Sequence, residues 1–139
     1  MIKPGELVFV DSGAWIALAL TRDPLHARAR TTWDELDQQG VKARTSIPVV
    51  LETFTFLERN VSREIALTWK DRLTQIARFK LLECTARDVE ASWAWFRRRD
   101  LHKLSAVDAT SFTLMRRKKI HAAFTFDQHF AQAGFRVLG

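Results

Sequence analysis

The sequence of 139 residues has little cysteine, proline or glycine and no long apolar run. Its one cysteine, Cys84, excludes an internal disulfide framework and is typical of a protein from a reducing compartment. The longest apolar stretch, LVFVDSGAWIALAL, is interrupted by Asp11 and is shorter than the roughly 20 residues that a membrane-spanning helix needs. No basic segment precedes it and no small-residue cleavage site follows, so we expect no signal peptide. These absences predict a cytoplasmic protein without a membrane segment.

The five glycines and three prolines predict tight turns and a high helix content. Apolar residues make up 47% of the chain and charged residues 27%, which is typical of a soluble globular protein. Neither a linker nor an internal repeat interrupts the sequence. We therefore expect one domain over residues 1–139.

Acidic residues are fewer than basic residues, and the difference lies entirely in the second half of the chain. The net charge is +6, yet residues 1–70 carry nine Lys/Arg and nine Asp/Glu, against thirteen and seven in residues 71–139. Such an excess favours a polyanionic partner, because lysine and arginine release counterions when they bind phosphates. Two basic clusters, 97–99 and 116–119, also fall near expected helix ends, where cations complement the helix dipole. Both explanations stay open at this point.

Short apolar runs alternate with amphipathic segments along the whole chain. We expect strands at 6–10, 41–45, 79–84, 121–126 and 135–138. We expect helices at 12–20, 23–39, 48–60, 62–76, 86–98 and 105–119, with starts marked by Ser12, Asp23–Pro24, Ser46, Ser62, Thr85 and Ser105. This alternation predicts an α/β domain with a largely parallel sheet and helices on both faces. In such sheets ligands bind beyond the carboxyl ends of the strands.

Four carboxylates fall at that edge of the expected sheet. Asp11 and Asp127 end strands, Glu52 lies one turn into a helix that follows a strand, and Asp108 lies in the first turn of a helix. Like charges gathered in a partly buried site are unfavourable unless one is protonated or a cation neutralises them. The usual cation with oxygen ligands is Mg²⁺ or Mn²⁺. The placement therefore suggests a metal site.

Each carboxylate also has a simpler explanation. Asp11 could cap a helix, Asp108 could complete a capping box with Ser105, Glu52 could reach solvent, and Asp127 could open a loop. Four such coincidences at one sheet edge are less probable than any one of them. We favour the metal site for that joint reason.

The segments VFVDSGAW, TSIPVVLETF, LSAVDATSF and AFTFDQHF, with the closing HFAQAGFRVL, resemble the PIN-domain ribonuclease family in the family's order, and specifically its VapC-like toxins. The resemblance covers nearly the whole chain and implies a three-layer α/β/α fold with a mainly parallel sheet of four to five strands. It implies that four acidic residues bind the metal and act in catalysis: Asp11, Glu52, Asp108 and Asp127. It also implies that four hydroxyl residues accompany them: Ser12, Ser46, Ser105 and Thr125. Many relatives have an aspartate where this chain has His129.

By this resemblance the protein is an Mg²⁺- or Mn²⁺-dependent endoribonuclease that leaves a 5′-phosphate and a 3′-hydroxyl. Our candidates for RNA contacts are Lys103, Arg97, Arg98, Arg99, Arg116 and His129. The resemblance also implies a small cognate antitoxin, whose C-terminal segment would lie along a basic cleft. It implies a homodimer as well, for which the helices at 48–60 and 62–76 offer a surface.

Three other functions are compatible with parts of this pattern. One is a PIN-type nuclease of RNA maturation or decay without an antitoxin, and another is a catalytically silent RNA- or protein-binding module on the same fold. The third, a phospho-acceptor signalling domain, usually needs an acidic pair at the first strand and a lysine on the last. Asp11 has no acidic neighbour and FRVLG supplies no lysine, which argues against that function.

Overall fold

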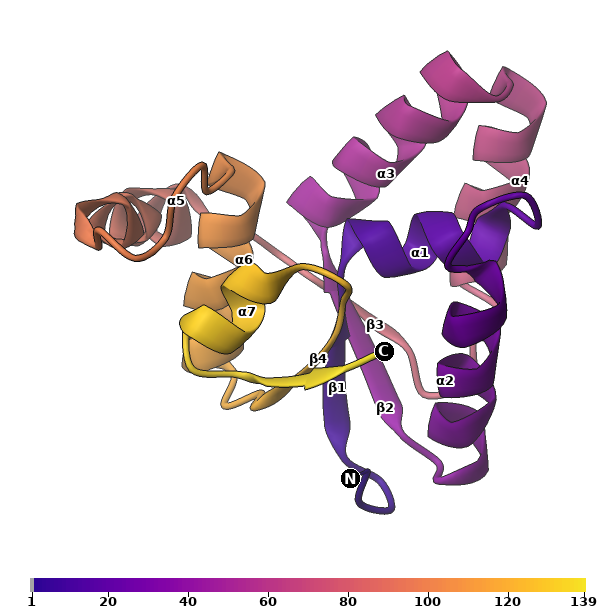
Figure 1. Ribbon diagram of the computed structural model, residues 1–139, viewed down its shortest axis with the longest axis horizontal. Coiled ribbons are helices and arrows are strands. Elements are labelled where there is room, and N and C mark those ends of the chain that lie inside the picture. The colour runs from indigo at the N-terminus through magenta and orange to yellow at the C-terminus, as the bar shows by residue number, and fades with distance from the viewer. Residues whose placement is uncertain (1) are drawn as a thin grey trace.

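A single parallel sheet forms the centre of the molecule, shown in Figure 1 as a computed structural model that describes residues 2–139. Its strands are β1 (Leu7–Val10), β2 (Lys42–Ser46), β3 (Lys80–Leu82), β4 (Ala122–Phe124) and β5 (Arg136–Leu138). All four pairings are parallel, in the order β3-β2-β1-β4-β5. The predicted α/β class is confirmed. Strand order reverses between β1 and β4, which is where such sheets place a ligand.

Helices cover both faces of this sheet and give the three layers (Figure 1). They are α1 (Ser12–Ala19), α2 (His26–Gln38), α3 (Ile47–Asn60), α4 (Arg63–Leu73), α5 (Ala86–Ser92), α6 (Ala106–Arg117), α7 (Gln128–Gln132) and the 3₁₀ helix η1 (Trp93–Arg97). The helices α1 and α2 lie on one face, while α5 and α6 lie on the other. Among residues 2–139, no helix combines the length and the apolar character that a bilayer crossing requires.

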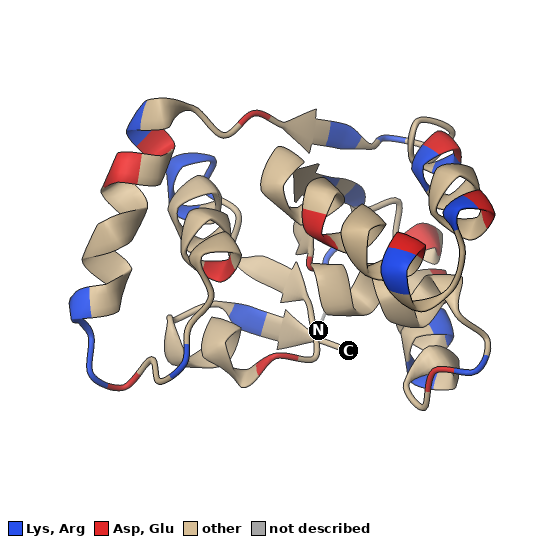
Figure 2. Cartoon of the chain, turned by 90° about the horizontal axis from the view of Figure 1, so that it is seen from above, with Lys and Arg blue, Asp and Glu red and all other residues tan. Residues whose placement is uncertain are grey.

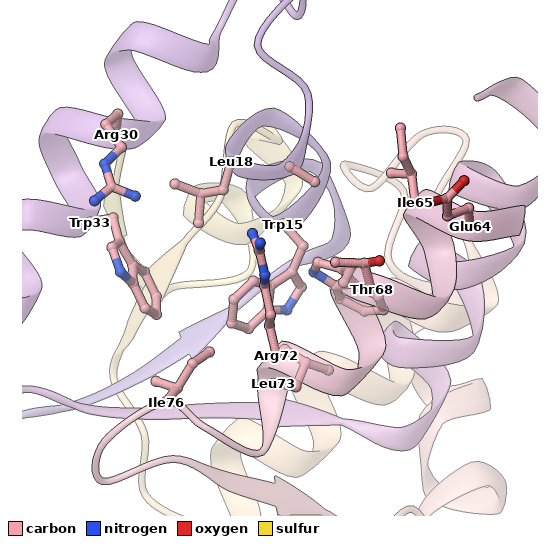
Figure 3. Close-up of a pocket in the computed structure, with 12 residues that line it drawn as sticks. Trp15, Leu18, Arg30, Trp33, Glu64, Ile65, Thr68, Arg72, Leu73 and Ile76 are labelled. Atoms are coloured by element: carbon pink, nitrogen blue, oxygen red, sulfur yellow. The ribbon is translucent and has the colours of Figure 1, made fainter. Parts of the chain in front are cut away.

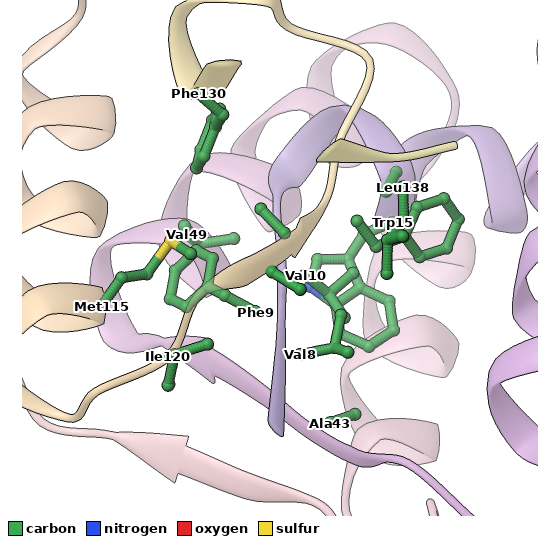
Figure 4. Packing of buried hydrophobic residues seen from close by; sticks show 14 of the residues in the cluster. Val8, Phe9, Val10, Trp15, Ala43, Val49, Met115, Ile120, Phe130 and Leu138 are labelled. Carbon is green, nitrogen blue, oxygen red and sulfur yellow. The ribbon is translucent and has the colours of Figure 1, made fainter. Parts of the chain in front are cut away.

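The core is built on both sides of β1, because successive side chains of a strand point to opposite faces. Phe9 points to the face that Met115 of α6 covers, and Val8 and Val10 point to the opposite face, next to Trp15 of α1 (Figure 4). These three of the four residues of β1 are fully buried. Burial on both faces explains why the strand reads as a continuous apolar run. It also fixes the position at which the chain leaves the sheet, directly before Asp11.

Four of the six predicted helix starts are confirmed by side-chain caps. The hydroxyls of Ser46, Ser62, Thr85 and Ser105 each accept a hydrogen bond from the backbone N–H three residues later. These bonds satisfy backbone donors that have no partner within the helix. At Thr85 the capping box is complete, since Asp88 accepts the N–H of Thr85 in return. A helix therefore starts at a defined residue just after β2 and again just before Asp108.

The other two predicted starts are wrong in position. The N-cap of α1 is Asp11, and the hydroxyl of Ser12 donates instead to Glu52 across the sheet edge. Helix α2 begins at His26, because Asp23 accepts the N–H of Leu25 and so closes a local turn before the helix. In both places a side-chain hydrogen bond competes with capping.

Several other predicted elements differ from the structure in extent. The helix expected at 86–98 ends at Ser92 and continues as η1, whereas the short helix α7 falls where we expected only a connection. The strands β3, β4 and β5 are each three residues long and shorter than predicted. Apolar residues therefore continue past the ladder into the loops that follow, as Phe126 does after β4.

Candidate active site

The carboxyl edge of the sheet carries a cavity of about 550 Å³ that all four predicted acidic residues line. The cavity is lined by Asp11, Ser12, Gly13, Glu52, Ser105, Asp108, Phe126, Asp127, Gln128, His129 and Gln132. Seen from above, acidic segments lie around the strand ends in the middle of the molecule (Figure 2). Segments from the ends of β1 and β4 and from the starts of α3, α6 and α7 thus meet at one place.

Asp11 is the most deeply placed of the four, with 4% of its surface exposed. The hydroxyl of Thr125 donates to Asp11 Oδ2 at 2.9 Å, while Oδ1 is buried and has no hydrogen-bond partner in the part of the chain described. Burial, with a smaller contribution from the charges of Glu52 and Asp127, raises the pKa of Asp11 to about 6 against the opposing hydrogen bonds from Ser12 and Thr125. A buried acceptor without a donor is costly, so Oδ1 is available for a ligand.

Glu52 reaches the cavity from the second turn of α3. Its Oε1 accepts the hydroxyl of Ser12 at 2.6 Å, a bond between α1 and α3 that holds the carboxylate toward Asp11. Ser46 sets the start of α3 by accepting the N–H of Val49 at 3.2 Å, and the structure shows no bond from its hydroxyl to an acidic group. Ser46 therefore positions Glu52 only through the helix.

Asp108 and Asp127 come together from opposite sides of the cavity. The backbone N–H of Asp108 donates to the Ser105 hydroxyl at 3.0 Å, while an oxygen of the Asp108 carboxyl lies within 4.8 Å of one from Asp127 and completes no capping box. Burial, the charges of Asp11, Asp127 and Glu52 and the nearness of the Asp127 carboxyl together raise the pKa of Asp108 to about 8. Two carboxyl groups this close share one proton when no cation separates them. Asp127 also caps α7, by accepting the N–H of His129 at 2.9 Å.

The donor set of this cavity fits a divalent cation. One ligand atom each from Asp108, Asp127 and His129 lie within 4.8 Å of one another, and Asp11 presents its unpartnered oxygen to the same cavity. Carboxylate oxygens suit Mg²⁺ and Mn²⁺, and a cation would remove the repulsion that raises the two pKa values. The charges and ligand atoms of the cavity are therefore those of a site for a divalent cation.

The basic residues predicted to bind RNA do not line the cavity, with the exception of His129. Arg98 pairs with Asp100 at 2.6 Å and donates to the carbonyl of Gln132, and both Arg98 and Arg116 stack on the ring of Trp95. The remaining three, Arg97, Arg99 and Lys103, are exposed on η1 and the segment that follows it. The charged groups that do line the cavity, apart from His129, are all acidic.

Sequence reasoning missed α7 and with it the two cavity residues Gln128 and Gln132. A signal was present: Asp127 is a good N-cap residue, and Gly134 follows at the distance expected after a short helix. The resemblance named Thr125 as a hydroxyl residue beside the acids, but no local pattern predicted that it bonds both Asp11 and the N–H of Asp127. This bonding depends on how β1 and β4 lie side by side.

A second cavity, of about 390 Å³, lies away from the acidic residues and shares no lining residue with the first. It is a groove between α1, α2 and α4, lined by Trp15, Leu18, Ala19, Arg30, Trp33, Glu64, Ile65, Thr68, Trp69, Arg72, Leu73 and Ile76 (Figure 3). Trp15 packs against Trp33 and Trp69 with ring centroids 5.7 and 6.1 Å apart. We call this the tryptophan groove. Trp69 Nε1 is buried there without a hydrogen-bond acceptor among residues 2–139.

Known proteins with this sequence pattern and fold are PIN domains. The PIN domain family matches residues 8–136. The 23S rRNA-specific endonuclease VapC20 of Mycobacterium tuberculosis is 36% identical over 130 residues, which cover 93% of this chain and 95% of that protein.

Solved structures agree with this match. The crystal structure of M. tuberculosis VapC20, a sarcin–ricin loop cleaving toxin, superposes with a TM-score of 0.82 at 34% identity and covers 92% of this chain and 95% of that one. VapBC2 from Rickettsia felis, bound to a DNA fragment from its promoter, has the same fold, with a TM-score of 0.67 at 10% identity over 94% of this chain and 96% of that one. The chain therefore belongs to the PIN-domain family, and over nearly its whole length it is similar to a VapC toxin.

Proposed function

We propose that this protein is a divalent-metal-dependent endoribonuclease, formed by residues 1–139 as one nuclease domain, and the toxin of a toxin–antitoxin pair. The observation that carries the proposal is the meeting of Asp11, Glu52, Asp108 and Asp127 in one cavity at the switch point of the sheet. Its support from relatives is the 36% identity to an rRNA-specific endonuclease. The large-subunit ribosomal RNA is therefore the first substrate to test.

In this proposal the four carboxylates hold Mg²⁺ or Mn²⁺, with Asp11 and Asp108 as the most buried ligands. When bound, such a cation polarises the scissile phosphate and lowers the pKa of a water that attacks it. Thr125 and Ser12 orient Asp11 and Glu52 by the hydrogen bonds that they donate. A carboxylate that is not protonated accepts the proton of the attacking water, and the exposed cations Arg97, Arg99 and Lys103 hold the RNA backbone.

The test is cleavage of total RNA and intact ribosomes by the purified protein, freed from any bound partner. We expect cleavage with Mg²⁺ or Mn²⁺, loss of cleavage with EDTA, and loss with Asp11→Asn, with fragments that carry a 5′-phosphate and a 3′-hydroxyl. Cleavage that persists in EDTA would contradict the metal-dependent mechanism. A folded protein that cuts neither substrate would favour the silent binding module.

The proposed partner is a small antitoxin, and the tryptophan groove is the surface that suits it. Its floor is aromatic, and Arg72, which lines it, forms no ion pair with any described residue. An apolar segment that carries a carboxylate meets both features. The test is co-expression with the product of a neighbouring short reading frame: Arg72→Ala should weaken the complex while leaving RNA cleavage unchanged. Without such a neighbour, an RNA-maturation nuclease is the better assignment.

The homodimer stays a proposal, supported by exposed apolar side chains on the two helices for which we predicted it. On α3 and α4, four large apolar residues are between 40% and 63% exposed: Ile47, Leu51, Phe56 and Leu67. Exposed apolar groups gathered on adjacent helices are typical of interaction surfaces. Light scattering of the purified protein, compared with Leu51→Asp, tests whether this surface joins two copies.

A further inference from the structure

The ring of His129 lies between the acidic residues and the segment that precedes α6. Its Nε2 is 2.6 Å from the backbone carbonyl oxygen of His102, and its Nδ1 is 3.0 Å from Asp127 Oδ1. The side chain is 20% exposed, and Nδ1 itself is buried. One ring nitrogen thus faces the main chain and the other faces the cavity.

The carbonyl of His102 determines which nitrogen carries the proton of a neutral ring. A carbonyl oxygen can only accept a hydrogen bond, so Nε2 must be the donor at 2.6 Å. Nδ1 then presents a lone pair to an oxygen of Asp127, and no described group donates a hydrogen bond to it. Two acceptors 3.0 Å apart repel unless a proton or a cation lies beside them.

The surroundings of Nδ1 are those of a cation site with a mixed donor set. One ring nitrogen of His129 and one oxygen each of Asp108 and Asp127 lie within 4.8 Å of one another, close to the spread of three ligands about one ion, and Nδ1 is the nitrogen 3.0 Å from Asp127. Asp11 Oδ1, in a side chain 4% exposed, is an independent buried acceptor in the same cavity that no described group satisfies. A histidine whose second nitrogen donates to a backbone carbonyl is also in the arrangement that metal-binding histidines adopt.

We propose that His129 binds a cation through Nδ1 together with Asp108 and Asp127, and that this nitrogen ligand makes the site prefer Mn²⁺ to Mg²⁺. The inference rests on the proposed metal-dependent function. Mg²⁺ is a hard ion that binds oxygen almost exclusively, whereas first-row transition ions accept imidazole readily. The His102 carbonyl fixes the ring orientation and keeps the proton off Nδ1.

The direct test is pulsed electron paramagnetic resonance of untagged protein loaded with one equivalent of Mn²⁺. We expect a ¹⁴N coupling to the manganese in the wild type, and its loss in His129→Asp and in His129→Ala. His102→Ala is the matched control, because it removes a nearby exposed imidazole but keeps the backbone carbonyl that orients His129. That variant should keep the coupling.

Calorimetric titration with Mn²⁺ and with Mg²⁺ gives the preference. Because even the partners of metal ligands contribute 10- to 100-fold to affinity, we expect His129→Asp to lower the Mn²⁺-to-Mg²⁺ affinity ratio by about tenfold or more. Manganese that binds without a nitrogen coupling, or a coupling retained in His129→Asp, overturns the inference but leaves the nuclease proposal standing. A coupling found in a protein that does not cut RNA would support the ligand assignment and count against the nuclease.

Discussion

At the scale of single residues, the acidic site is held together by hydroxyl groups as much as by carboxylates. Thr125 donates to Asp11 and accepts the N–H of Asp127, so one buried side chain orients residues from both strands at the switch point. Ser12 does the same for Glu52. The site depends on these bonds because, in the absence of a cation, the mutual repulsion of the acids opposes their close placement.

Replacing Thr125 by valine removes both bonds while keeping the shape of the side chain. We expect metal affinity and the cleavage rate to fall by about tenfold, since partners that orient metal ligands are typically worth 10- to 100-fold. Calorimetric metal binding and initial cleavage rates measure this. Thr125→Ser retains the hydroxyl and should stay close to the wild type. A Val variant with normal metal affinity would show that Asp11 needs no orienting bond.

The raised pKa of Asp108 predicts how the stability of metal-free protein depends on pH. The pKa is about 8 in the folded state, against 3.8 as the ordinary value. Between these values the unfolded chain has lost a proton that the folded chain keeps, so the free energy of unfolding falls as pH rises from about 4 to about 8. Above pH 8 this contribution is absent and the dependence levels off.

Thermal unfolding in EDTA measures this effect, with Asp108→Asn as the comparison because its amide does not titrate. We expect the melting temperature of the wild type to fall, relative to that variant, on the order of 5 °C between pH 5 and pH 8. Adding Mn²⁺ at pH 8 should restore it, since the cation replaces the shared proton. Parallel pH profiles of the two proteins would show that Asp108 is not buried against like charges.

At the scale of helices and strands, the sequence predicted the start of a helix wherever that start depends on one side chain and the backbone next to it. The caps Ser46, Ser62, Thr85 and Ser105 act on backbone groups three residues away, so their spacing alone predicted four helix starts. Ser12 failed as a cap because its partner, Glu52, is forty positions along the chain. No local pattern contains that information.

The carboxylate of Asp88 caps its own helix and also bonds to a residue of another helix. It completes the capping box of α5 and also accepts two hydrogen bonds from Arg117 at the end of α6, at 2.8 and 2.9 Å. These bonds and the charge of Arg117 hold the pKa of Asp88 below its ordinary value, despite the opposing effect of burial. The capping box was predictable, and the pairing of α5 with α6 was not.

Replacing Asp88 by alanine removes the cap and leaves Arg117 without its partner. The side chain of Asp88 is 5% exposed but lies near the surface, where solvent screens the pair, so we expect a loss of about 2 kcal/mol in the free energy of unfolding. Denaturant titration measures it. Asp100→Ala removes a similar bond to Arg98 from an exposed site and should leave the midpoint unchanged. Equal effects of the two substitutions would argue against the double role of Asp88.

At the scale of the whole molecule, the alternation of elements predicted the fold class but not the strand order. The acidic site depends on that order, because Asp11 and Asp127 meet only if β4 returns to lie beside β1. The resemblance to PIN domains grouped the four acids in one site without giving that strand order. The charge pattern was likewise visible as an excess in the second half, yet its division between stacked and free arginines needed the three-dimensional contacts.

That division predicts how RNA binding responds to salt. Arg99 and Lys103 are exposed and form no ion pair within residues 2–139, and they flank His102, whose carbonyl is tied to His129 at the cavity. Each phosphate contact lowers the logarithm of affinity by about 0.7 for every tenfold rise in salt on a single strand, so Arg99→Ala and Lys103→Ala should each reduce the slope by about that amount. Fluorescence anisotropy of a short single-stranded RNA, in EDTA to prevent cleavage, measures both slopes.

Arg72→Ala is the matched control, because it removes one equally free cation from the tryptophan groove. If Arg72→Ala changed the slope as much as the other two, the RNA would follow the groove, and that surface would no longer be free for an antitoxin.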